Sequence, residues 1–157
     1  AWPEVSKQSP GCRLWLVGEG PDRDQLFQQI KDLDLRGQVV LPGAFDDVEE
    51  VLRAANLFIL PSYFEGLSIS LMEAMAHQVP VIASDIPGNH DIIQSGINGN
   101  LVPAGDVSAL SQAIQDALAK PDQLKRWATA AYQTIQEHYS LASMVDAHLK
   151  LFEQLVA

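Results

Sequence analysis

Residues 57–76 read LFILPSYFEGLSISLMEAMA, and this stretch contains both kinds of element from which we predict the fold. Residues 57–60 are apolar without a break, which is typical of a parallel strand covered by helices on both faces. A polar turn with a glycine follows, and either Ser68 or Ser70 can cap a helix that contains Leu71. The stretch therefore predicts a strand, a loop and a helix in succession.

The same alternation recurs along the rest of the chain, apart from residues 1–11, which offer at most a short helix. It predicts an α/β fold: a doubly wound, Rossmann-like parallel sheet with flanking helices, whose ligand crevice lies beyond the carboxyl ends of the strands. Further strands are expected at Leu14 to Val17, Gln38 to Leu41, Val81 to Ala83 and Asn100 to Val102, and further helices from Pro21, from Asp46 or Asp47, from Asp106, from Pro121 and from Ser140.

Composition limits the possible partners. The 157 residues fit one domain, and 10 Lys and Arg against 20 Asp and Glu give a net charge of −10. This charge argues against binding to nucleic acid or directly to an anionic membrane. The single cysteine, Cys12, excludes an internal disulfide and a cysteine-cluster metal site. No apolar run approaches the length of a membrane span, so a cytoplasmic location is expected.

A glycine-containing loop follows the strand expected at residues 14–17. Its residues Gly18, Glu19 and Gly20 match only part of the dinucleotide-binding fingerprint. Glycine lets a ligand approach the backbone closely, but a strand-to-helix turn also requires glycine for structural reasons alone. The loop by itself therefore leaves both interpretations open.

Two glutamates follow the strand at residues 57–60. Glu65 lies in the loop, and Glu73 lies eight residues later on the expected helix. A carboxylate accepts hydrogen bonds from two hydroxyls at once, which suits the vicinal diol of a sugar or a ribose. The amides of residues 69–71 would suit phosphates, because a helix start attracts anions. On spacing alone, the alternatives are a solvated helix face for Glu73 and a charge favoured by the helix dipole for Glu65.

The glutamate segment resembles a known signature. Residues 65–68 (EGLS), 73–76 (EAMA) and 80–83 (PVIA) are together similar to the E-x7-E signature of retaining, nucleotide-sugar-dependent glycosyltransferases of the GT-B class, particularly glycosyltransferase group 1. The resemblance covers nearly the whole chain and implies the carboxy-terminal half of a GT-B fold. Other motifs of that family are resembled, in the same order, by residues 16–21, 39–43, 54–62, 96–103 and 105–106.

The resemblance implies a role for each matching residue. Glu65 would contact hydroxyls of the transferred sugar, and Glu73 would hold the ribose. The remaining contacts would come from backbone: Gly66, Leu67 and Ser68 facing the sugar and diphosphate, Gly18, Glu19 and Gly20 as the glycine-rich loop, and Leu41, Pro42 and Gly43 beside the base. The donor would be a UDP-, GDP- or ADP-sugar, with no cofactor and no metal.

The resemblance also implies that more of the protein lies upstream. In that family, basic side chains for the diphosphate come from a strand before the glycine-rich loop, and here no Lys or Arg lies between Arg53 and Lys120. We therefore expect residues 1–157 to be a single donor-binding domain that lacks its first strand and the amino-terminal acceptor domain. The acceptor, a glycan, lipid or small molecule, and any contact with the cytoplasmic membrane face would involve that missing domain. The isolated chain is expected to be inactive.

The sequence also leaves three alternatives. A nucleotide-sugar epimerase or phosphorylase of GT-B architecture would share the donor pocket. A non-catalytic, receiver-like module would need a switch lysine, and none lies between Lys31 and Lys120. Two DxD patterns, at residues 22–24 and 32–34, match the metal-binding motif of other glycosyltransferases. Aspartates two apart on a helix point in different directions, which argues against a metal there.

Overall fold

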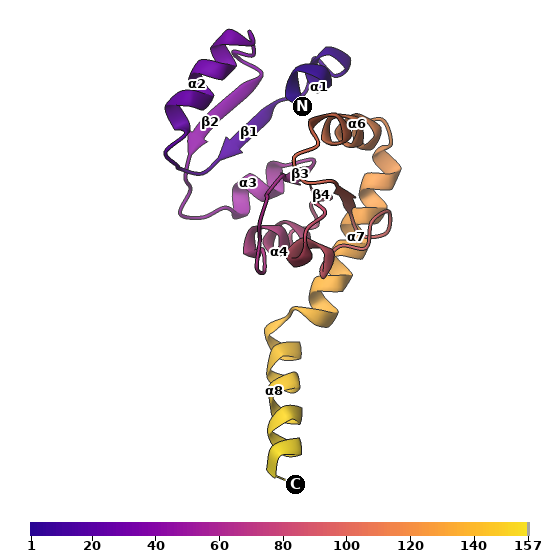
Figure 1. The fold of residues 1–157 in the computed structure, drawn as a ribbon. Helices are drawn as coiled ribbons and strands as arrows, with labels where there is room; N and C mark the ends of the chain where they lie inside the picture. The colour runs from indigo at the N-terminus through magenta and orange to yellow at the C-terminus, as the bar shows by residue number, and fades with distance from the viewer. Residues whose placement is uncertain (157) are drawn as a thin grey trace.

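The computed structural model describes residues 1–156, and its helices and strands alternate through most of the chain (Figure 1). All five expected strands are present, two of them with the expected bounds and the other three with ends shifted by one or two residues. The elements are α1 (Trp2–Gln8), β1 (Leu14–Val17), α2 (Arg23–Asp32), β2 (Val39–Gly43), α3 (Glu49–Ala54), β3 (Phe58–Leu60), α4 (Ile69–Ala76), β4 (Val81–Ser84), α5 (Pro87–His90), β5 (Asn100–Val102), α6 (Val107–Leu118), α7 (Pro121–His138) and α8 (Leu141–Val156).

The strands pair in parallel, as expected, but they form two sheets. One sheet has the order β1-β2 and the other the order β3-β4-β5. Figure 1 shows β1 and β2 with α2 beside the larger sheet and its helices. The expected parallel α/β arrangement is confirmed, but within these residues it is divided in two, because β1 and β3 do not pair with each other.

The larger sheet is doubly wound, and β4 shows this most directly. All four of its residues are buried, and successive side chains of a strand point to opposite faces. Val81 and Ala83 belong to a core cluster with residues of α4 and α7, whereas Ile82 belongs to a second cluster with residues of α1 and α6. Helices therefore cover both faces of this sheet, which explains why its strands consist mostly of apolar residues.

The smaller sheet supports less packing. No residue of α2 is buried, and Trp15 and Val17 of β1 are 51% and 42% exposed. The apolar positions of α2 were predicted from their spacing, but none of them is buried in the part of the chain that the structure describes.

Most expected helix starts are confirmed and one is wrong. Pro121 is at the first position of α7. Pro21 instead lies in a turn before α2, which begins at Arg23. At the start of α3, Oδ1 of Asp47 accepts a hydrogen bond from the N–H of Glu49 over 2.8 Å, although the N-cap residue Val48 has no side-chain cap. Further side-chain caps are Ser68 to the N–H of Leu71, Asp106 to the N–H of Ala109 and Ser140 to the N–H of Ser143.

The last helix, α8, extends away from the rest of the molecule in Figure 1. Its apolar side chains repeat at helical spacing and are about half exposed or more. Among residues 1–156, no helix combines the length and apolar character that crossing a bilayer requires. The exposed apolar residues of α8 are Leu141, Met144, Val145, Leu149, Leu151, Phe152 and Leu155.

Candidate functional site

The glycine-rich loop and the end of β2 meet at the carboxyl edge of the smaller sheet. The backbone N–H of Gly18 donates to the carbonyl of Gly43 over 2.9 Å. A cavity of about 240 Å³ opens here. The expected loop residues and Leu41 are thus brought together, although residues 41–43 form the end of β2 and not a loop after it. The cavity is lined by Leu16, Val17, Gly18, Glu19, Gly20, Asp22, Arg23, Leu26 and Leu41.

One residue that lines this cavity, Arg23, is basic, and we did not predict it as part of the site. The guanidinium of Arg23 donates to the carbonyl of Leu41 over 3.2 Å and lies 3.6 Å from Oε1 of Glu19. Arg23 therefore ties the first turn of α2 to the end of β2. The i, i+4 spacing of Glu19 and Arg23 could have indicated their ion pair, but the contact with Leu41 depends on the tertiary structure.

Two features favour glycine at position 43, at the end of β2. Its φ of +90° is a conformation that L side chains rarely adopt, and an added Cβ would lie 2.7 Å from Oε1 of Glu19. A larger residue here would displace the Glu19 side chain and with it the Arg23 contact. Glycine at this position therefore fits close packing between β2 and the loop.

The loop between β3 and α4 presents Glu65. This residue is partly buried, and Oγ of Ser62 donates to its Oε1 over 2.8 Å. Among residues 1–156, no Lys, Arg or His nitrogen lies within 4.0 Å of the side-chain carboxylate of Glu65 or of Glu73. The loop thus offers a carboxylate with unused acceptor capacity for a ligand.

Gly88 of α5 lies against the same loop. A Cβ on Gly88 would come within 2.6 Å of the carbonyl oxygen of Glu65, and closer still to that of Gly66. Only a glycine allows α5 to approach the backbone of the loop this closely. The sequence predicted neither α5 nor this contact, because nothing in the spacing of the residues shows which loops touch.

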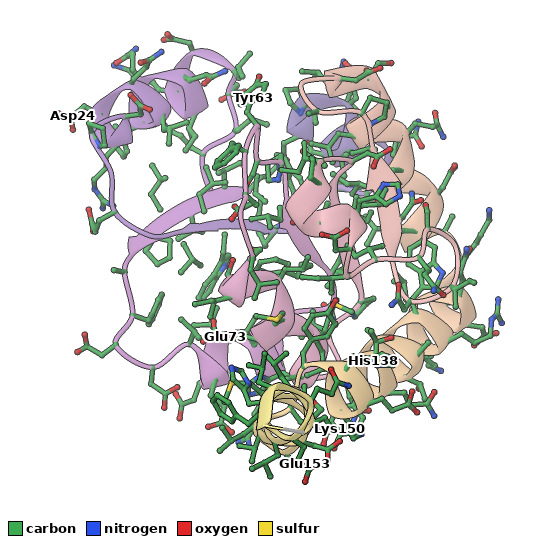
Figure 2. The ribbon with its side chains drawn as sticks, turned by 60° about the horizontal axis from the view of Figure 1, so that its bottom comes forward. Asp24, Tyr63, Glu73, His138, Lys150 and Glu153 are labelled. Carbon is green, nitrogen blue, oxygen red and sulfur yellow. The ribbon has the colours of Figure 1, made fainter. Side chains whose placement is uncertain are left out.

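Glu73 lies on the second turn of α4 with its side chain exposed. In Figure 2 the side chains of Tyr63, in the β3–α4 loop, and Glu73 lie well apart. Glu73 therefore lies away from the part of the β3–α4 loop that carries Tyr63. Its exposure leaves the solvated-face interpretation possible on geometry alone, so the role of Glu73 stays a prediction.

The start of α4 offers fewer amides than the sequence suggested. Ser68 is buried, and its Oγ accepts a hydrogen bond from the N–H of Leu71, so this amide is already satisfied. Within residues 1–156, the amides of Ile69 and Ser70 have no hydrogen-bond acceptor. An anion at this helix start would meet two amides, not the expected three.

His90 and Asp85 form a pair after β4. Nδ1 of His90 lies 2.8 Å from Oδ1 of Asp85, and both side chains are well exposed. The hydrogen bond to Asp85, followed by the charge of that carboxylate, raises the pKa of His90 above its ordinary value. In the part of the chain that the structure describes, no three His, Cys, Asp or Glu residues gather as a metal site would require.

Parallel strands with helices on both faces make this a doubly wound α/β domain, with the two glutamates after β3. Residues 1–134 match the sequence model of the family described as glycosyl transferases group 1, so the chain belongs to that family. The resemblance noted from the sequence is thereby confirmed.

Curated relatives are of the same kind. The chain is 31% identical over 148 residues to the lipopolysaccharide core biosynthesis glycosyltransferase LpsE of Rhizobium meliloti (strain 1021), covering 94% of this chain and 44% of LpsE. It is 32% identical over 153 residues to the 2-deoxystreptamine N-acetyl-D-glucosaminyltransferase of Streptomyces fradiae, covering 88% of this chain and 36% of that protein. The chain thus spans less than half the length of these relatives.

Solved structures confirm the fold. A mutant of S. aureus TarM, in complex with Fondaparinux, alpha-GlcNAc-glycerol and UDP, superimposes with a TM-score of 0.89 at 28% identity, covering 96% of this chain and 31% of TarM. Sucrose-phosphate synthase from Thermosynechococcus elongatus gives a TM-score of 0.86 at 28% identity, covering 99% of this chain and 41% of that one.

We predict that Gly88→Ala distorts the Glu65 loop. The added Cβ meets backbone oxygens that have little room to move, and overpacking of this kind lowers the free energy of unfolding by about 1–3 kcal/mol. Urea denaturation measures the change. Gly11→Ala is the matched control, because nothing lies within 4 Å of a Cβ at Gly11. Equal stability of the two variants would contradict the close contact.

We predict that Asp85→Asn lowers the pKa of His90 towards its ordinary value, since it removes the negative charge that favours the protonated ring. An NMR titration of the imidazole carbons measures this pKa. Asp91→Asn is the control and should lower it less, because the charge of Asp91 makes the smallest contribution. A raised pKa means that the pair stabilises the fold fully below the unfolded pKa and loses this effect as pH rises through the folded pKa. An unchanged pKa in Asp85→Asn would exclude the pairing.

Proposed function

We propose that this chain is the donor-binding part of a retaining glycosyltransferase that uses a nucleoside diphosphate sugar without a metal. The observation that carries the proposal is the family match over residues 1–134, together with a Glu65 carboxylate that no cation neutralises among residues 1–156. The UDP in the related TarM crystal structure supports a uridine nucleotide as the first donor to test.

Each part of the donor then has a proposed partner. Glu65 accepts hydrogen bonds from hydroxyls of the sugar, and Glu73 accepts them from the two hydroxyls of the ribose. The backbone of residues 66–68 faces the sugar and diphosphate. The base lies beside the main chain of residues 41–43, where the cavity at Gly18, Glu19 and Gly20 supports a binding role for this edge.

Of the parts of the donor, the diphosphate has the fewest candidate binding groups in this chain. The amides of Ile69 and Ser70 at the start of α4 favour an anion, but within residues 1–156 no Lys or Arg lies on the chain between Arg53 and Lys120. Arg23 is in the cavity, yet it already contacts Leu41 and Glu19. We therefore assign the cationic groups that stabilise a leaving diphosphate to a segment outside this chain.

The split sheet supports a missing strand. β1 and β3 belong to different sheets, and in a doubly wound sheet one further parallel strand between them would join the two. We propose that this strand precedes residue 1 in the whole protein. An acceptor-binding domain, which would take a glycan, lipid or small molecule, then accounts for the remaining length relative to LpsE. The transfer step belongs to that longer protein and not to residues 1–157 alone.

The donor assignment predicts different effects for the two glutamates. Ligand-observed NMR with UDP-glucose, GDP-mannose and ADP-glucose should detect binding of at least one at millimolar concentration. Glu73→Ala should weaken the nucleotide sugar and its free nucleotide alike, by roughly tenfold or more, because it removes hydrogen bonds to a charged group. Glu65→Ala should weaken the nucleotide sugar but not the free nucleotide.

Glu137→Ala, an exposed carboxylate on α7, is the matched control and should change neither affinity. If none of the three nucleotide sugars binds, or if Glu73→Ala binds them as the wild type does, the donor site proposed here is wrong.

A further inference from the structure

Ser62 is the side chain that contacts the Glu65 carboxylate. Its Oγ lies 2.8 Å from Oε1 of Glu65 and donates the hydrogen bond, because an ionised carboxylate has no proton to give. In the part of the chain that the structure describes, this is the only hydrogen bond made by the Ser62 hydroxyl. A serine hydroxyl in a loop can bond to neighbouring backbone groups, whereas that of Ser62 bonds to the side chain of Glu65.

The backbone at Glu65 packs closely against α5. Gly88 of α5 lies against the carbonyl oxygens of Glu65 and Gly66. The freedom that remains is in the glutamate side chain, which loses much rotamer entropy when it is fixed. The hydrogen bond from Ser62 removes that freedom before a ligand arrives.

The same hydrogen bond decides which acceptor sites stay open. A carboxylate has two oxygens with about four lone-pair sites, and Ser62 occupies one site on Oε1. No Lys, Arg or His nitrogen lies within 4.0 Å of this carboxylate among residues 1–156. Oε2 and the second site on Oε1 remain for hydroxyl donors.

We propose that Ser62 is a positioning residue that orients Glu65 to receive the hydroxyls of the donor sugar. This rests on the proposed function. Ser62 itself does not touch the sugar; it acts through Glu65, as a fixed acceptor costs less to order on binding than a mobile one. Its removal should therefore weaken recognition of the sugar and leave recognition of the nucleotide unchanged.

The experiment compares UDP-glucose with UDP on the wild-type 157-residue chain and three variants by NMR titration. Ser62→Ala should raise the Kd for UDP-glucose by about tenfold, which corresponds to about 1.4 kcal/mol. Its Kd for UDP should stay within about twofold of wild type. Ser62→Thr keeps the hydroxyl and should restore UDP-glucose binding. Ser108→Ala, at an exposed position on α6, is the matched control.

A double-mutant cycle separates orientation from a general effect on the loop. In a Glu65→Ala background, Ser62→Ala should cause no further loss of UDP-glucose binding. Three results overturn the proposal: Ser62→Ala binds UDP-glucose as wild type does, it loses UDP and UDP-glucose to the same extent, or its effect persists without Glu65. If a nucleotide sugar other than UDP-glucose is the one that binds, the same variants are titrated with it and with its free nucleotide. Failure of the wild-type chain to bind UDP-glucose, GDP-mannose and ADP-glucose alike overturns the proposed function and this assignment together.

Discussion

The position of β4 between two cores is the constraint on which the candidate site depends. Val81 and Ala83 pack on the α4 and α7 side, and Ile82 packs on the α1 and α6 side. With both faces covered, β4 fixes β3 and β5 beside it in parallel. The loops that follow β3 and β4 then leave the same edge of the sheet, which is how α5 comes to lie against the loop that carries Glu65.

Charge at the site has a consistent distribution. The chain has a net charge of −10, and its candidate ligand groups are carboxylates and backbone amides. Carboxylates suit the hydroxyls of a sugar and a ribose, whereas a diphosphate needs positive charge. Arg23 lies at the glycine-rich loop but is engaged with Glu19. The negative net charge argued against anionic partners. It is consistent with the part of the site that would bind hydroxyls, and not with the part that would bind a diphosphate.

Much of the fold could be predicted from the sequence because its signals are local. Short runs dominated by apolar residues indicated all five strands, and Ser68, Asp106 and Ser140 indicated helix starts that form as expected. The division into two sheets could not be predicted from these runs, since they do not specify which strands are neighbours.

The candidate site follows the same division. The sequence was enough to predict that Glu65 lies in a loop and that Glu73 lies on the helix that follows. In contrast, the contacts of Arg23 with Leu41 and of Gly88 with the Glu65 loop join segments distant in the sequence. Pro21 satisfied the local rule for a helix start, but α2 begins at Arg23. Tertiary contacts such as those of Arg23 and Gly88 decide the geometry of the site.

A crystal structure of the chain with UDP-glucose tests the central claim most directly, namely that one donor spans the edges of both sheets. We expect uracil beside residues 41–43, ribose hydroxyls on Glu73, and glucose hydroxyls on Glu65 at hydrogen-bond distances of about 2.5–3.0 Å. A nucleotide bound elsewhere, or bound at this edge with neither glutamate in contact, would contradict that claim.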